Sequence, residues 1–117
     1  MSQRPDLVCI GMALVDSIIK GFDPEPISAS GYRAVSSTLS VGGEAVNEAM
    51  AAAKLGTKTA ILCSLGEDAA GDMIAAALSG SGADCSRIVR SAGIGSAYTD
   101  KTYIRCSHRY AEEAQTF

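Results

Sequence analysis

The sequence predicts an α/β domain with a largely parallel sheet, and three observations support this class. Short apolar segments typical of buried strands alternate with two alanine-rich segments typical of helices. The chain has 117 residues, close to the usual size of one domain, and 47% of them are hydrophobic. No internal repeat and no linker marks a second domain. We therefore expect one core.

The first elements are a strand, an ambiguous segment and a loop. Leu7 to Met12 is a short apolar run between polar residues, which predicts a buried strand. Ala13 to Lys20 fits neither helical nor strand periodicity clearly. Gly21 to Pro26 is expected to be a loop because two prolines interrupt any helix or strand ladder.

The segment from Arg33 to Val41 alternates between apolar and polar residues. Val35, Leu39 and Val41 would share one face of a strand, with serine, threonine and alanine on the other. This pattern predicts a half-buried strand in an antiparallel or edge position.

Two helices and a second buried strand follow. Glu44 to Leu55 is predicted to be helical from its alanines, and Gly56 is placed to end that helix. Lys58 to Leu65 is apolar enough for a second buried strand. Asp68 to Leu78 predicts the second helix, which we expect to end within Ser79 to Gly82.

The rest of the chain carries weaker patterns. Cys85 to Val89 is a short strand candidate, Ser91 to Gly95 a loop, and Tyr98 to Arg105 another strand. Ser107 to Phe117 is polar and weakly helical. We assign no role to His108, the one histidine of the sequence.

Composition argues against several classes of protein. The net charge is −3 with no run of Lys or Arg, and aromatic residues make up 5% of the chain, so a nucleic-acid surface is not expected. No apolar run reaches the roughly 18 residues that a membrane span needs. The polar amino terminus lacks a secretory pattern, so we expect a cytoplasmic protein with no membrane partner.

The four cysteines form no CxxC pair. Cys9 and Cys63 lie inside apolar runs, whereas Cys85 and Cys106 stand far apart from each other in the sequence. This spacing favours reduced, buried thiols over a zinc site or a disulfide framework, so no metal is expected.

Gly42 and Gly43 open the first predicted helix, and glycines there let a ligand or backbone approach closely. A Walker phosphate loop would need Lys and Ser or Thr where the sequence has Glu44. A dinucleotide fingerprint needs three glycines after the first strand, where Gly11 stands alone. A neutral, hydroxyl-rich ligand bound by helix N–H groups and Asn47 is a third reading. Residue types alone favour a fourth, tight packing of the helix on the sheet.

Residues 42–66 resemble the first signature of the ribokinase-like (PfkB) family of carbohydrate and nucleoside kinases. The matching positions are Gly42, Gly43, Ala45, Asn47, Ala49, Gly56 and Gly66. The segment Val8 to Asp16 resembles the family's first strand and the acidic residue after it, and Ser64 to Gly71 extends the likeness into the second helix. The similarity covers about Leu7 to Val89.

This resemblance implies a three-layer α/β fold with a small β-sheet lid over the acceptor site. The lid strands would lie at about residues 33–41 and 98–105. Asp16 would accept hydrogen bonds from sugar hydroxyls, Gly42 and Gly43 would present backbone donors, and Asn47 would hold another hydroxyl. Without the resemblance, Asp16 would cap a turn and Asn47 would face solvent.

The same resemblance implies ATP and Mg²⁺ for the complete enzyme. Family members carry the catalytic aspartate, the anion hole and the nucleotide pocket in their carboxy-terminal half, on a Gly-Ala-Gly-Asp-like segment. The sequence contains no Gly-x-Gly-Asp. Residues 1–117 are therefore expected to be the amino-terminal portion of a kinase, with no catalytic residue and no activity alone.

Two further expectations follow. A sheet left open at this point would expose an edge and an apolar face, which predicts a homodimer through the lid strands or the exposed sheet edge. The rival reading is a non-catalytic α/β module for small-molecule binding or assembly that kept the packing glycines.

Overall fold

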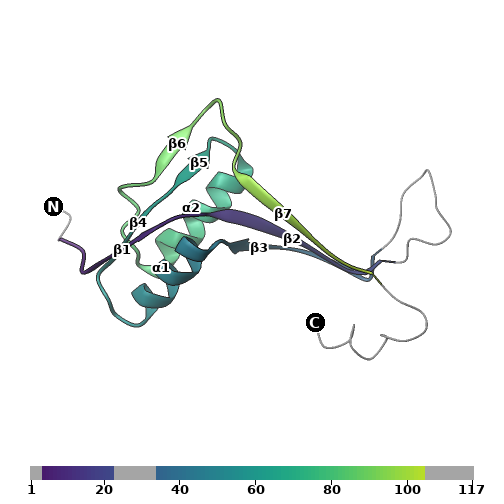
Figure 1. The fold of residues 1–117 in the computed structure, drawn as a ribbon, viewed down its shortest axis with the longest axis horizontal. Coiled ribbons are helices and arrows are strands. Elements are labelled where there is room, and N and C mark those ends of the chain that lie inside the picture. The colour runs from purple at the N-terminus through teal and green to yellow at the C-terminus, as the bar shows by residue number, and fades with distance from the viewer. Residues whose placement is uncertain (1–3, 23–33, 105–117) are drawn as a thin grey trace. The chain divides into compact units, whose positions relative to one another are not determined.

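A computed structural model describes residues 4–22 and 34–104 of the chain (Figure 1). The elements, in chain order, are β1 (Leu7–Ile10), β2 (Leu14–Phe22), β3 (Ser36–Gly42), α1 (Glu44–Lys54), β4 (Thr59–Leu62), β5 (Ser64–Gly66), α2 (Ala69–Ser81), β6 (Val89–Ser91) and β7 (Ala97–Ile104).

The described residues divide into two compact units. We call residues 4–15 and 41–98 the core unit, and residues 16–22, 34–40 and 99–104 the strand unit. The core unit contains both helices and the short strands β1, β4, β5 and β6. Most residues of β2, β3 and β7 belong to the strand unit, and these strands form one sheet in the order β3-β2-β7.

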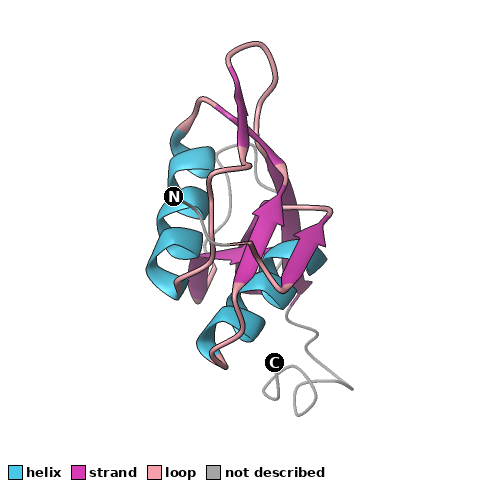
Figure 2. Ribbon diagram, turned by 90° about the vertical axis from the view of Figure 1, so that its left-hand side faces the viewer, coloured by secondary structure: helices cyan, strands magenta, loops and turns pink. Residues whose placement is uncertain are grey.

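The core unit is built on two parallel strand pairs. β1 pairs with β4 in parallel, with Cys9 opposite Ile61, and β5 pairs with β6 in parallel. α1 packs on β1, β4 and α2, while α2 also packs on β5 (Figures 1 and 2). The expected α/β arrangement with parallel strands is confirmed. The largest fully buried side chains belong to Ile61, Leu65, Ile74, Leu78, Val15 and Val46.

The single strand predicted for Lys58 to Leu65 is two strands. Residues Thr59–Leu62 pair with β1, whereas Ser64–Gly66 pair with β6. The carbonyl of Cys63, between them, accepts a hydrogen bond from the Val89 N–H at 3.0 Å. The chain therefore changes partner at Cys63, and an apolar run contains no signal for such a change.

Both helices begin near the predicted residues and end within the predicted segments. α1 ends at Lys54, with Gly56 just beyond it as expected. α2 continues through Ser79 and Gly80 to Ser81, whose hydroxyl donates to the Leu78 carbonyl at 2.6 Å. Gly82, in the left-handed conformation, ends this helix. The expected end within Ser79 to Gly82 is confirmed, and the helical residues continue three positions past Leu78.

The strands of the strand unit differ from the prediction in extent and burial. β2 covers the segment that was ambiguous and includes Gly21 and Phe22, which were expected in a loop. β3 begins later than predicted. Val35 and Leu39 are 76% and 58% exposed, so the prediction that they lie on a half-buried face is wrong. β3 is an edge strand of its sheet, which is one of the two positions that the sequence predicted for it. An edge strand has a neighbour on one side, which leaves its side chains more open.

The last elements are shifted relative to the prediction. The strand expected at Cys85 to Val89 is β6 at Val89–Ser91, because the preceding residues form a turn in which Ile88 N–H donates to the Cys85 carbonyl at 3.1 Å. β7 covers nearly the residues of the second predicted lid strand. The weakly helical segment Ser107 to Phe117 lies outside the described residues.

One face of the core unit is apolar and open. In the parallel register Ile10 lies opposite Leu62, so the two side chains share a face, and Val8 lies on it as well. Ile10 is 69% exposed, and Val8 and Leu62 are also exposed, while Cys9 on the opposite face is buried. We call Val8, Ile10 and Leu62 the open face.

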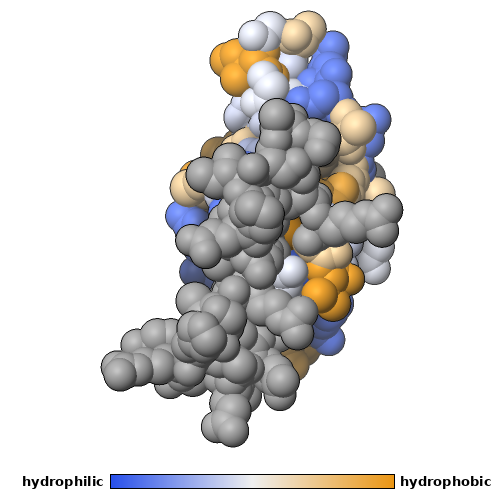
Figure 3. Space-filling view, turned by 90° about the vertical axis from the view of Figure 1, so that its right-hand side faces the viewer, coloured by the Kyte–Doolittle hydropathy of each residue, from blue (hydrophilic) through white to orange (hydrophobic). Residues whose placement is uncertain are grey.

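The exposed residues and the burial of the cysteines can be compared with what the composition predicts. On the side seen in Figure 3, apolar residues reach the surface among hydrophilic ones. Cys9 and Cys63 are buried, as predicted, whereas Cys85 is only partly buried and Cys106 lies outside the described residues. None of the helices in residues 4–22 and 34–104 has the length and apolar character needed to cross a bilayer.

Candidate functional site

Gly43 precedes α1 in a conformation that suits glycine. Its φ is 100°, and a β-carbon added there would lie 2.3 Å from the carbonyl oxygen of Met12. A contact that short with backbone cannot be relieved by turning a side chain. The glycine therefore makes room for the connection between β1 and β2, as the packing interpretation requires. Gly42, beside it, is the buried last residue of β3.

The amino terminus of α1 has no side-chain cap among the described residues. The first N–H groups of a helix have no partner within the helix and carry partial positive charge. Asn47 donates its N–H to the Gly43 carbonyl at 2.9 Å, which closes the first turn, and its side chain is exposed. This helix start can therefore offer N–H donors to a ligand with lone pairs.

Asp16, on β2, is bound by two side chains of the neighbouring strand β7. The Thr99 hydroxyl donates to Asp16 Oδ1, and Lys101 Nζ lies 3.2 Å from Asp16 Oδ2. Both carboxylate oxygens therefore have a partner within the strand unit.

The electrostatics of this cluster keep Asp16 ionised. The hydrogen bond from Thr99 and the nearby ammonium of Lys101 lower the pKa of Asp16 from its ordinary 3.8, and together they outweigh the effect of burial. The Asp16 side chain is 13% exposed, whereas that of Lys101 is 49% exposed. At neutral pH the cluster is a shielded carboxylate with an accessible ammonium beside it.

The structure places the predicted site residues in both units. Gly42, Gly43 and Asn47 lie together at the start of α1 in the core unit. Asp16 is the first residue of the strand unit. That all four bind one ligand stays a prediction.

Two neighbours of Asp16 were missed by the sequence reasoning. Thr99 and Lys101 alternate with Asp100 along β7, so they share one face of that strand. The period-two spacing was visible within the predicted strand. Nothing local linked it to Asp16, which is 83 residues away from Thr99.

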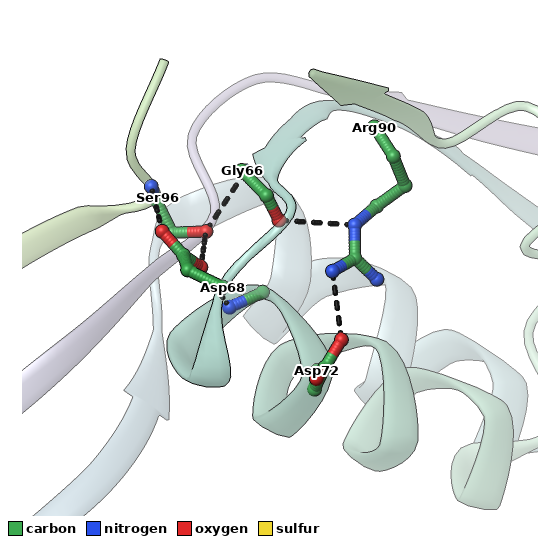
Figure 4. A network of polar contacts seen from close by, with 6 residues as sticks. Gly66, Asp68, Asp72, Arg90 and Ser96 are labelled. Carbon is green, nitrogen blue, oxygen red and sulfur yellow. Dashed lines mark hydrogen bonds and ion pairs between the residues drawn. The ribbon is translucent and has the colours of Figure 1, made fainter. Parts of the chain in front are cut away.

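A polar network in the core unit joins the start of α2 to the loop before β7 (Figure 4). Asp68 caps α2 by accepting from the Gly71 N–H at 2.7 Å. Its carboxylate also accepts from the N–H and the hydroxyl of Ser96, at 2.8 and 2.7 Å. The Ser96 hydroxyl oxygen accepts from the Gly66 N–H at 2.9 Å. These bonds lower the pKa of Asp68, with the Ser96 N–H as the largest cause.

The structure explains why Gly66 cannot carry a side chain. An added β-carbon would lie 2.6 Å from Asp68 Oδ2, from the Ile94 carbonyl oxygen and from the Ser96 nitrogen. Arg90 extends the network by donating from Nε to the Gly66 carbonyl at 3.0 Å, and it forms an ion pair with Asp72 at 2.7 Å (Figure 4). Gly66 is thus a structural position.

In the part of the chain that the structure describes, no three His, Cys, Asp or Glu side chains lie close enough together to hold a metal ion.

Comparison with known families gives a match over most of the chain. Residues 4–104 match the family described as pfkB family carbohydrate kinase. The match includes Asp16, Gly42, Gly43 and Asn47, as well as Thr99 and Lys101.

Solved structures show the same fold. A ribokinase from Arabidopsis thaliana, complexed with ribose and ATP, is 27% identical with a TM-score of 0.77, over 86% of this chain and 32% of that one. A fructokinase from Xylella fastidiosa is 26% identical with a TM-score of 0.64, over 80% and 27%. A PfkB protein from Polaromonas sp. JS666 is 25% identical with a TM-score of 0.69, over 85% and 31%. The match covers about a third of the length of each.

Proposed function

Because the chain belongs to the pfkB family of carbohydrate kinases, we propose that it is the acceptor-binding part of an ATP-dependent kinase. The complete enzyme would transfer the γ-phosphoryl group of ATP to a hydroxymethyl group of a sugar or nucleoside. The observation that carries this proposal is the family match over residues 4–104, which includes every acceptor-binding residue that the resemblance implied.

The proposed roles follow from the chemistry of each group. Asp16, ionised and shielded, accepts hydrogen bonds from two acceptor hydroxyls through its remaining lone pairs. Gly42 and Gly43 offer backbone N–H groups at the start of α1, where the helix dipole favours an electron-rich oxygen. The exposed Asn47 amide can both donate to and accept from a further hydroxyl.

We assign ATP and Mg²⁺ to the complete enzyme and no catalytic residue to this chain. Phosphoryl transfer depends on groups that position and stabilise the transferring phosphoryl. The Gly-x-Gly-Asp segment that would supply them in this family does not occur in the sequence. The isolated chain is therefore proposed to bind an acceptor without phosphorylating it. ADP formation that depends on an added sugar would refute this part of the proposal.

Self-association is a second proposed property. The open face consists of exposed Val8, Ile10 and Leu62, and β1 and β3 are edge strands that can pair further. We propose that the chain forms a homodimer through this face or through a strand edge. Light scattering after size-exclusion chromatography tests this association, and a monomer at every concentration would contradict it.

The free thiols Cys9 and Cys63 support a cytoplasmic location.

Calorimetric titration with D-ribose, D-fructose and a panel of nucleosides tests acceptor binding. We expect one of them to bind, and Asp16→Ala to weaken it at least about tenfold, equivalent to about 1.4 kcal/mol. Asp100→Ala is the matched control, because Asp100 is an exposed aspartate on the opposite face of β7.

The outcome separates the proposal from its rival. Equal loss in both variants, or no loss in either, would place the ligand elsewhere than at Asp16. A folded chain that binds no acceptor would favour the non-catalytic module. In that module Gly43 would serve packing alone, and its close approach to Met12 fits this role.

A further inference from the structure

The cluster of Asp16, Thr99 and Lys101 contains the ammonium group of Lys101, which has no role in the proposed binding of acceptor hydroxyls by Asp16. Lys101 Nζ has three N–H donors, and one of them points to Asp16 Oδ2 at 3.2 Å. Among the described residues Asp16 is the one ion-pair partner of this ammonium, and about half of the Lys101 side chain is exposed, so its other donors can reach a ligand. An ammonium beside the proposed hydroxyl-binding carboxylate thus offers a second point of contact.

The cluster also changes which ligands can approach. An unpaired aspartate repels an anionic ligand, because two like charges at short range cost free energy. Here Lys101 balances the charge of Asp16, and the pair is neutral as a whole. Thr99, which lies on β7 as Lys101 does, donates its hydroxyl to Asp16 Oδ1, so Thr99 is a positioning residue that fixes the carboxylate.

We propose that Lys101 determines acceptor specificity and favours a polyol carrying a carboxylate over the neutral polyol with the same carbon chain. The proposal rests on the proposed function, in which Asp16 holds acceptor hydroxyls. The hydroxyls of the acceptor donate to Asp16, while its carboxylate accepts from Lys101. A charge-assisted hydrogen bond between an ammonium and a carboxylate is about twice as strong as a neutral one.

Matched open-chain pairs test the preference. D-Gluconate and D-glucitol differ only at the first carbon, as do D-ribonate and ribitol, so each pair isolates the carboxylate. Calorimetry on the 117-residue chain at pH 7 should show the acid of at least one pair binding about tenfold more tightly, equivalent to about 1.4 kcal/mol. The preference should weaken in high salt, since Lys101 is partly exposed.

Three variants separate specificity from folding. Lys101→Gln should remove the preference for the acid, so that the affinity for the acid falls about tenfold more than the affinity for the neutral polyol. Lys101→Arg, which keeps the positive charge, should retain the preference. Lys58→Gln is the control, because Lys58 is an exposed lysine in the core unit. Thermal unfolding of each variant reports whether it is folded.

Each outcome has one reading. Equal affinity for acid and neutral polyol in the unmodified chain overturns the inference, as does a preference that survives Lys101→Gln. If neutral polyols bind in an Asp16-dependent way without any preference for acids, the proposed function stands and the inference fails. If none of the four probes binds while D-ribose, D-fructose or a nucleoside does, the inference fails and the proposed function stands. If no acceptor of either kind binds, or if binding is unaffected by Asp16→Ala, both fail.

Discussion

Replacing Gly43 by alanine tests whether this glycine is required by close packing. Two costs are expected. The φ of 100° lies in a region that residues with a β-carbon rarely adopt, at about 1–3 kcal/mol. The new methyl group would also lie 2.3 Å from the Met12 carbonyl oxygen, and such overpacking costs about 1–3 kcal/mol. The free energy of unfolding should therefore fall by about 2–6 kcal/mol.

Gly56→Ala is the matched control for this experiment. Gly56 also has a positive φ, 90°, but a β-carbon there would have no neighbour within 4 Å. It should cost only the conformational part, about 1–3 kcal/mol. The difference between the two variants therefore measures the contact with Met12.

Urea unfolding followed by circular dichroism is the assay. With a slope of about 2 kcal/mol per M, a loss of 2 kcal/mol lowers the midpoint by about 1 M. If Gly43→Ala loses no more stability than Gly56→Ala, the close approach of Met12 is not what requires glycine. A stable Gly43→Ala variant that fails to bind any acceptor would instead favour a ligand-binding role for this position.

Three further predictions concern pH, packing and thiols. The pKa of folded Asp68 lies below its ordinary 3.8, so its stabilisation is present above about pH 4 and is lost as the pH falls through the folded value. Asp68→Asn should flatten the loss of stability below pH 4 in urea titrations, and an unchanged profile would contradict this. Leu78→Ala, at a fully buried position, should lower the free energy of unfolding by about 2–5 kcal/mol, and a loss below about 1 would show that the site is poorly packed. Burial raises the pKa of Cys9 and Cys63, so iodoacetamide at pH 7 should label both only after unfolding, and rapid labelling of the folded chain, seen by mass spectrometry, would refute this.

The sequence predicted best those features that depend on local residues. The alanines of α1 and the glycine after it indicate the helix and its end, because helix propensity and the C-terminal glycine act over a few residues. β2 was ambiguous because apolar residues fall on both of its faces, as in Val15 and Ile18-Ile19, which hides the alternation of a strand.

The sequence predicted least where two distant segments meet. The contact of Gly43 with Met12 and the bonds of Thr99 and Lys101 to Asp16 depend on which strands become neighbours. No pattern within either segment specifies that choice. The family signature indicated Asp16 and Gly43 as important, but it contained no information on the neighbours that hold them.

The parallel pairing of β1 with β4 has a consequence for synthesis of the chain. Adjacent strands in parallel cannot form from a local hairpin, and here β2, β3 and α1 are all made between the two partners. On the ribosome, Leu7–Ile10 must wait without a strand partner until Thr59–Leu62 has emerged. Nascent chains stalled before Leu62 should therefore be digested readily by protease, and resistance should begin only once β4 has left the exit tunnel.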